Sequence, residues 1–278
     1  MAKGEQIDRR WIFLCVAAAI AATLFYPFRQ SITPSPSVRS VYEFIQGLPR
    51  GSTILIATDF DPSAQAELAP MLDALLEHCF RQDVRVVGMT FWPTGSSMAK
   101  QIFGSVAKRY GKVSGTDYVY LGYKPGEAQV IIAMGEKIES AFPRDADDRP
   151  TAGMPIFRTV SRLPDLRYLI DLAAGATVDV WIVYGGDKYH VPMGAGCTAV
   201  SGPDNYVFLS TGQLNGLIAG LRGAADYEVL LNKPGPGVLG MAAQSTVHGI
   251  IVLFVIIGNV AYFRSRRAAK RAQEQSHG

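Results

Sequence analysis

The chain has 278 residues, of which 48% are hydrophobic and 18% are charged. This balance excludes an intrinsically disordered protein, and the length is sufficient for one or two folded domains. The net charge of +3 is unevenly distributed, because residues 35–240 contain 18 Lys and Arg against 21 Asp and Glu. Nucleic-acid-binding domains carry basic residues on the folded body, so we exclude that class and expect no nucleic-acid partner.

An uncharged apolar run, Trp11–Phe28, begins directly after Arg9 and Arg10. Its length and its aromatic ends are typical of a membrane-spanning helix with interfacial anchors. A cleaved signal peptide is the alternative, since a basic start followed by an apolar run fits both. Bulky side chains occupy Leu24–Phe28, where a cleavage site requires small ones, so we favour an uncleaved anchor.

A second apolar run, Val247–Phe263, ends at a tail with five Lys and Arg residues within 264–271. Basic residues flank the cytoplasmic end of a span, so we expect the tail in the cytoplasm, and two spans return the N-terminus to that side. The expected protein is therefore a two-pass protein of the plasma (inner) membrane with an extracytoplasmic middle. Its expected segments are a cytoplasmic N-terminus (1–10), a first transmembrane helix (11–28), a Pro/Ser spacer (29–37), an α/β domain (38–231), a Pro/Gly linker (232–245), a second transmembrane helix (246–263) and a basic cytoplasmic tail (264–278).

Between the two runs, short and strongly apolar stretches alternate with amphipathic ones. The apolar stretches predict strands buried on both faces, and their alternation with helices predicts a parallel sheet. We therefore expect an α/β fold, a Rossmann-like parallel sheet with helices on both faces, flanked by two transmembrane helices. The expected strands are 53–58, 83–90, 117–121, 167–173, 179–185 and 196–200, and the expected helices are 62–81, 96–110, 126–142 and 211–231.

Polar residues at the strand ends form the candidate site, because ligands of open parallel sheets bind beyond the carboxyl ends of the strands. Asp59 and Asp61 follow the first strand, Thr90 ends the second, and Asp187 follows a later one. This pattern resembles the haloacid-dehalogenase-like phosphohydrolases. The resemblance implies catalytic roles for Asp59 (nucleophile), Asp61 (acid/base), Thr90 and Asp187, Mg²⁺ binding by Asp59 and Asp187, and phosphate neutralisation by Lys124.

The sequence departs from that family at two points. Val191 stands where a second acidic residue is expected after Asp187, and no cap segment follows the first strand. Asp61 before Pro62 also fits a helix N-cap followed by a proline at the first helical position. Outside the resemblance we assign no catalytic residue, metal ligand or cofactor, and Mg²⁺ is expected only with the phosphohydrolase.

Gly235, Gly237 and Gly240 match the GxGxxG dinucleotide pattern by letter. A dinucleotide loop needs a strand before it and a helix of a βαβ unit after it. No strand is expected before Gly235, and the following helix is the second apolar run. We therefore expect a linker here and no phosphate-binding loop.

His78 and His190 have no Cys or His partner at metal-ligand spacing, so we expect structural or solvated side chains. Cys79 and Cys197 lie in a predicted helix and a predicted strand, and no CxxC motif occurs. A zinc site is therefore not expected, and one disulfide between these two cysteines is left open.

Four glycines recur inside the predicted helix 211–231, at Gly212, Gly216, Gly220 and Gly223. An interior glycine costs a helix about 1 kcal/mol relative to alanine. At about 100° per residue the glycines lie opposite an aliphatic face, which predicts an interaction face for close helix packing. The alternative is a helix–turn–helix broken at one of the glycines.

These features favour a membrane-anchored extracytoplasmic α/β domain that is a non-enzymatic binding or scaffold component of an envelope complex. The expected partners are the lipid bilayer and either a second copy of the chain or another membrane protein. The alternative is a metal-dependent phosphohydrolase that uses the acidic residues at the strand ends. The sequence does not decide between an enzyme and a binding protein.

Overall fold

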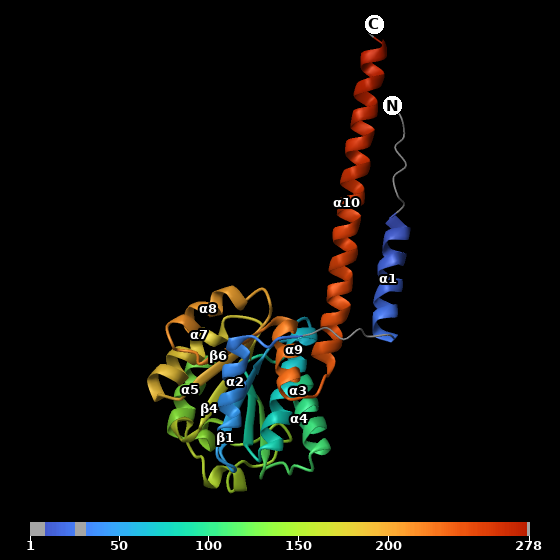
Figure 1. Cartoon of the computed structure of the whole chain (residues 1–278). Coiled ribbons are helices and arrows are strands. Elements are labelled where there is room, and N and C mark those ends of the chain that lie inside the picture. Colours follow the sequence, from blue (N-terminus) through green and yellow to red (C-terminus); the bar gives the residue numbers. More distant parts are fainter. Residues whose placement is uncertain (1–8, 26–31, 277–278) are drawn as a thin grey trace. The chain divides into compact units, whose positions relative to one another are not determined.

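A computed structural model describes residues 9–25 and 32–276 (Figure 1). The chain divides into two compact units. One is the α/β domain, Ile32–Val238, and the other takes in both ends of the chain, 1–31 and 239–278.

The domain is built on one sheet of six parallel strands in the order β3-β2-β1-β4-β5-β6. This is the strand order of Rossmann-type doubly wound sheets. The two central strands are entirely buried, as expected for strands covered on both faces. The predicted α/β class with a parallel sheet is confirmed. The strands are β1 (Thr53–Asp59), β2 (Arg85–Thr90), β3 (Tyr118–Tyr123), β4 (Tyr168–Ala173), β5 (Met193–Cys197) and β6 (Gly216–Ala219).

Helices cover both faces of the sheet (Figure 1). Alternate residues of a strand point to opposite faces, so Ile54 and Ile56 belong to one apolar core and Leu55 and Ala57 to the other. The first core is closed by α2 (Pro36–Gln46), α3 (Gln65–Arg81), α4 (Ser96–Arg109) and α9 (Gly220–Leu230). The second is closed by α5 (Glu127–Glu136), α6 (Ile138–Ala141), the short helices η1 (Pro155–Arg158) and η2 (Leu163–Asp165), α7 (Thr177–Trp181), η3 (Ile182–Asp187) and α8 (Gly202–Ser210).

The strand predicted at 179–185 is wrong, because this segment is helical. It forms the end of α7 and most of η3, a π-helix. Val178, Trp181 and Ile182 are buried at helical spacing, whereas Val183 is 54% exposed. The apolar, β-branched composition suggested a strand, but tertiary packing requires only one face of the segment to be apolar.

The single helix predicted at 211–231 is also wrong. Gly212 has a φ of +79° in a turn, Gly216 begins β6, and Gly220 has a φ of +62° at the junction with α9. A Cβ on Gly216 would lie 2.5 Å from Cγ2 of Val41, so this glycine admits the close approach of α2. Gly223 packs against Ile218. The four glycines therefore serve different local needs and form no common helix face.

Helix α2 was not predicted, because the Pro/Ser-rich stretch before it suggested a spacer up to residue 37. Pro36 stands in the first turn, where its missing N–H needs no acceptor. Val38, Val41 and Ile45 are buried on one side of the helix. Their spacing could have revealed the helix.

The chain ends form two apolar helices, α1 (Arg9–Phe25) and α10 (Pro236–Ser276). Among the described residues one helix, within Pro236–Arg267, is long and apolar enough to cross a membrane, and Arg10–Thr23 is a shorter apolar helix. The predicted pair of transmembrane helices is thus reduced to one candidate span. Residues 26–28 of the first predicted span lie outside the described residues, as do 29–31 of the predicted spacer.

Helix α10 begins ten residues before the predicted second span, so the predicted linker is largely helical. Of the predicted linker, Asn232–Gly235 alone is non-helical, and Asn232 has a φ of +54°. Within the terminal unit, Thr23 Oγ1 of α1 donates a hydrogen bond to Thr246 Oγ1 of α10 over 3.1 Å. The single Thr23 proton is shared with the Ala19 carbonyl, 2.8 Å away in the same helix, and the Thr246 hydroxyl donates to the Ala242 carbonyl over 3.0 Å. The two apolar helices therefore meet through a polar contact.

Candidate functional site

Two buried acids lie at the centre of the sheet, near the carboxyl end of the strands. Asp59 ends β1 and Asp171 lies in β4, and the sheet order changes direction between these two strands. This topological switch point is where open α/β sheets bind ligands. Both side chains have an exposed fraction of 0%. The site is therefore in the expected place but closed to solvent.

Hydrogen-bond donors surround the carboxyl group of Asp59. The Phe91 backbone N–H donates to Oδ1 over 2.6 Å, and the Trp181 indole N–H donates to Oδ2 over 3.3 Å. The Thr90 hydroxyl lies 3.2 Å from Oδ1, but the Thr58 carbonyl, at 2.8 Å, is the nearer acceptor of its single proton. Burial nevertheless raises the pKa of Asp59 to about 6, because loss of hydration disfavours the charged form more than these donors favour it.

Asp171 has fewer hydrogen-bond donors around its carboxyl group than Asp59 has. The Thr177 hydroxyl donates to its Oδ2 over 2.8 Å, whereas no described N–H or O–H group reaches its Oδ1. Burial, and then the neighbouring Asp59 charge, raises the pKa of Asp171 well above its usual range. A proton on Asp171 hydrogen-bonds to Asp59 and relieves both effects. The pair therefore holds one proton at neutral pH.

Of the four predicted catalytic residues, the structure brings together only Asp59 and Thr90. Asp61 turns away and accepts hydrogen bonds from the backbone N–H and hydroxyl of Ser63, which lower its pKa. Asp187 lies on the exposed surface and accepts a hydrogen bond from Gln213 over 2.9 Å. Among the described residues no three His, Cys, Asp or Glu side chains form a group that could hold a metal. The arrangement does not reproduce the phosphohydrolase pattern.

Asp171 was not identified from the sequence. Asp61 was predicted as a helix cap or an acid/base, and neither role describes its position fully. Asp171 is the single acid inside an apolar strand (YLIDLA), and this isolation was the available signal. Asp61 does not cap α3, which begins at Gln65, but it does order the turn that leads into the helix. Its role is local and structural.

A cavity of about 440 Å³ opens beyond the carboxyl end of β3. Its position fits the rule for open parallel sheets, although it lies at the sheet edge and not at the switch point. The Lys124 backbone N–H donates to the Thr90 carbonyl, and its ammonium lies 5.5 Å from the centre of the Phe142 ring. The lining includes Ser96, Gly122, Tyr123, Lys124, Phe142 and Arg144. This is an open space with basic side chains, in contrast to the sealed acid pair.

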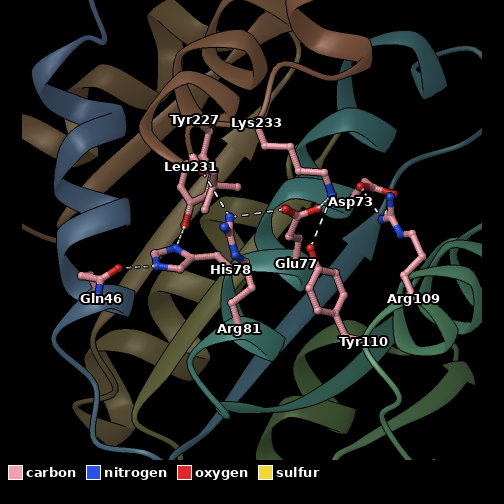
Figure 2. A network of polar contacts seen from close by, with 10 residues as sticks. All are labelled: Gln46, Asp73, Glu77, His78, Arg81, Arg109, Tyr110, Tyr227, Leu231 and Lys233. Atoms are coloured by element: carbon pink, nitrogen blue, oxygen red, sulfur yellow. Dashed lines mark hydrogen bonds and ion pairs between the residues drawn. The ribbon is translucent and has the colours of Figure 1, made fainter.

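His78 is structural, as expected. Its ring nitrogens bond the Tyr227 hydroxyl over 2.8 Å and the Gln46 side-chain oxygen over 3.1 Å (Figure 2). Its ring also stacks on Tyr42. Burial lowers the pKa of His78 to about 4, so the ring is neutral and bridges α2, α3 and α9. Cys79 and Cys197 are free and belong to the cores on opposite faces of the sheet, so they form no disulfide.

A polar network holds the segment that follows α9 (Figure 2). The ammonium of Lys233 bonds the buried carboxylate of Glu77 on α3 and lies 3.4 Å from the Tyr110 hydroxyl. The guanidinium of Arg81 donates to the Leu231 carbonyl over 3.2 Å. The turn before α10 is therefore fixed to the domain and is not a free linker.

The first turn of α10 binds a carboxylate of the domain itself. The backbone N–H groups of Gly235, Gly237 and Val238 donate to Glu228 of α9 over 2.7–2.8 Å. A Cβ on Gly237 would lie 2.9 Å from the Ala225 nitrogen, so glycine is needed for this approach. The GxGxxG letters thus do form an anion cradle at a helix N-terminus. Its anion is a buried side chain.

Helix α9 also holds the N-terminal segment of the α/β domain, around Thr33 and Ser35. The carboxylate of Asp226, also on α9 and 1% exposed, accepts a hydrogen bond from the Ser35 backbone N–H over 2.9 Å. Arg222 pairs with Asp226 over 2.7 Å and donates to the Thr33 carbonyl over 3.1 Å. Both ends of the α/β domain are therefore attached to α9, through two acids that are two residues apart.

No family model and no curated protein matches the chain. Among solved structures, trehalose-6-phosphate synthase OtsA is matched over 84% of this chain, at 11% sequence identity and a TM-score of 0.33. The match spans 45% of the length of that structure's chain. A likeness at this level assigns neither a family nor a function.

Proposed function

We propose that this protein is a membrane-anchored component of an envelope complex in which the α/β domain acts as a binding or scaffold module without catalytic activity. The observation that carries the proposal is the double attachment at α9. Asp226 fixes the segment that enters the domain and Glu228 fixes the segment that leaves it. Both attachments lie within the α/β domain and give its first and last segments a fixed structure, as a binding or scaffold module between two anchors requires.

The chain ends supply the anchoring in this proposal. In this proposal helix α10 spans the membrane, and the basic residues after Phe263 favour a cytoplasmic C-terminus. The shorter apolar helix α1 is the second anchor, and both termini then share the cytoplasmic side. The Thr23–Thr246 hydrogen bond supports pairing of the two helices, since hydroxyl contacts link helices within lipid.

The absence of catalysis in this proposal rests on the acid pair. Asp59 and Asp171 are fully buried, so a substrate has no access to them. The Phe91 and Trp181 N–H groups already donate to the two oxygens of Asp59, which makes the carboxyl group less available to attack phosphorus or to bind a metal. We assign the pair a structural role at the centre of the sheet.

Membrane topology is tested by labelling introduced cysteines with a membrane-impermeant maleimide. Val200→Cys reports on the domain, where Val200 is 87% exposed, and Ser276→Cys reports on the tail. We expect Val200→Cys to react in intact spheroplasts and Ser276→Cys to react only after permeabilisation. The opposite pattern contradicts the proposed topology.

Complex formation and catalysis are tested separately. Cross-linking in native membranes followed by native gel electrophoresis is expected to show a species larger than the 30.1 kDa chain. Purified protein is expected to show no Mg²⁺-dependent phosphatase activity. An activity that is present in the wild type and lost in Asp59→Asn overturns the non-enzymatic assignment.

A further inference from the structure

The cavity beyond β3 has the size and position of a ligand site. Its volume of about 440 Å³ lies within the range of small-molecule pockets, and it opens at the carboxyl end of a parallel strand. We propose that this cavity binds a small molecule that carries an anionic oxygen group, either a phosphate or a carboxylate, on a compact apolar body. This inference is independent of the membrane layout proposed above.

Lys124 supplies the charge for the anion. Its ammonium lies over the Phe142 ring and takes part in no ion pair with the described residues. The acid of the cavity lining, Asp145, does not neutralise it, because Arg149 binds Asp145 over 2.6 Å. The backbone N–H groups of Asp147 and Arg149 also donate to Asp145. Burial acts to raise the pKa of this carboxyl, but the Arg149 hydrogen bonds lower it below the usual value.

The N-terminus of helix α4 borders the cavity. Ser96, the first residue of this 14-residue helix, lines the cavity, and its own N–H donates to the Pro93 carbonyl over 3.4 Å. No side chain caps the helix N-terminus. The first N–H groups of a helix and its dipole both favour an anion. Gly122 has a φ of +84°, and a Cβ there would lie 3.2 Å from the Ala146 Cβ. A glycine at this point keeps the space between the loop and α4 open.

Apolar side chains form a part of the remaining lining. Leu121 and Phe142 are almost fully buried, and Pro143 lies beside them in the lining. Arg144 at the same cavity donates to the Asp148 carbonyl over 2.7 Å and pairs with its carboxylate. A purely inorganic ion would contact Lys124 and leave the apolar side chains of the lining without a partner. A ligand that also has an apolar body would contact both Lys124 and these apolar side chains.

The test uses the full chain in detergent and three matched probes: phenyl phosphate, benzoate and neutral phenol. Binding is measured by isothermal titration calorimetry. We expect saturable binding of at least one anion, and much weaker binding of phenol. The phosphate and carboxylate arms decide which anionic group is preferred.

Two variants locate the site. Lys124→Gln is expected to weaken binding of the preferred anion by about tenfold or more, as loss of a charge-assisted contact does. Lys108→Gln removes an exposed lysine from the last turn of α4 and is expected to leave binding unchanged. Ala146→Leu, which fills the cavity, is expected to abolish binding, with circular dichroism as the check on folding.

Three results overturn the proposal. They are the lack of saturable binding of either anion to the wild type, equal binding by Lys124→Gln and wild type, and equal weakening by Lys124→Gln and Lys108→Gln. If Ala146→Leu fails to fold, the two lysine variants still decide, because neither side chain is part of a core.

Discussion

The acid pair between β1 and β4 and the Glu228 carboxylate on α9 are both withdrawn from water, but they meet opposite surroundings. Asp171 faces another carboxyl group, and no described donor reaches its Oδ1. Glu228 faces three backbone N–H groups, that of Gly235 just before α10 and those of Gly237 and Val238 in its first turn. Burial raises the pKa of Glu228 as well, but the N–H groups act against that rise. A buried carboxyl group is thus stabilised in one of two ways: by a proton that removes its charge, or by several N–H groups that donate hydrogen bonds to its oxygens.

Removal of the cradle's carboxylate is expected to have the largest effect. Glu228→Ala leaves three N–H groups of the Gly235–Val238 segment without their acceptor, that of Gly237 buried and the other two partly buried, and an unsatisfied buried group costs about 1–3 kcal/mol. We expect a loss of about 4 kcal/mol in the free energy of unfolding, measured in urea, and faster hydrogen exchange at Gly237 and Val238. Asp204→Ala, at an acid in the first turn of α8, is the control. Equal exchange in Glu228→Ala and wild type contradicts the cradle.

The acid pair predicts a dependence of stability on pH. The pKa of Asp59 is raised from 3.8 to about 6, so below pH 6 the folded protein takes up a second proton, on Asp59, and holds it more tightly than the unfolded chain does. The stabilisation is complete below pH 3.8 and is lost as the pH rises through 6, with a change on the order of 3 kcal/mol.

Asp171→Asn sharpens this test, because its amide N–H replaces the shared proton at every pH. The difference in unfolding free energy between wild type and Asp171→Asn isolates the pair from other titrating groups. We expect the variant to gain relative to the wild type as the pH rises from 4 to 7. A difference that is independent of pH shows that the two carboxyl groups share no proton.

A smaller effect is expected at the turn before α10. Lys233→Met leaves the buried Glu77 carboxylate with only the more distant Arg81 as a cationic partner. We expect a loss of about 2 kcal/mol in the free energy of unfolding, because the remaining charge is poorly compensated. The double variant Lys233→Met/Glu77→Gln should recover most of the loss, since the unpaired charge is then gone. No recovery indicates that Lys233 acts through packing alone.

The smallest effect is expected for an ion pair outside both sites. Arg50 and Asp83 form a salt bridge, and the Arg50 side chain is 83% exposed. Because solvent screens such pairs, Arg50→Gln should change the free energy of unfolding by less than about 0.5 kcal/mol. A loss of unfolding free energy as large as that expected for Lys233→Met would contradict the argument that exposed ion pairs contribute less than buried ones.

The sequence by itself determined the α/β class and most of the strands, because these depend on local patterns. Runs such as Thr53–Asp59 are apolar on both faces, and this composition is typical of buried parallel strands. The long apolar helix near the C-terminus is equally local in origin. The predictions for residues 179–185 and 211–231 were wrong. The composition of each segment suits both a helix and a strand, and the residues that it packs against decide which one forms.

Only the tertiary structure decided the partners of the buried acids. Asp59 and Asp171 are distant in sequence and meet because β1 and β4 are adjacent, which no local pattern specifies. The GxGxxG letters predicted no anion site because no strand precedes them, yet Glu228 from the preceding helix occupies their N–H groups. The spacing of apolar residues predicts which face of a helix or strand is buried. The charged groups that lie beside a buried acid depend on how distant segments of the chain are connected and packed.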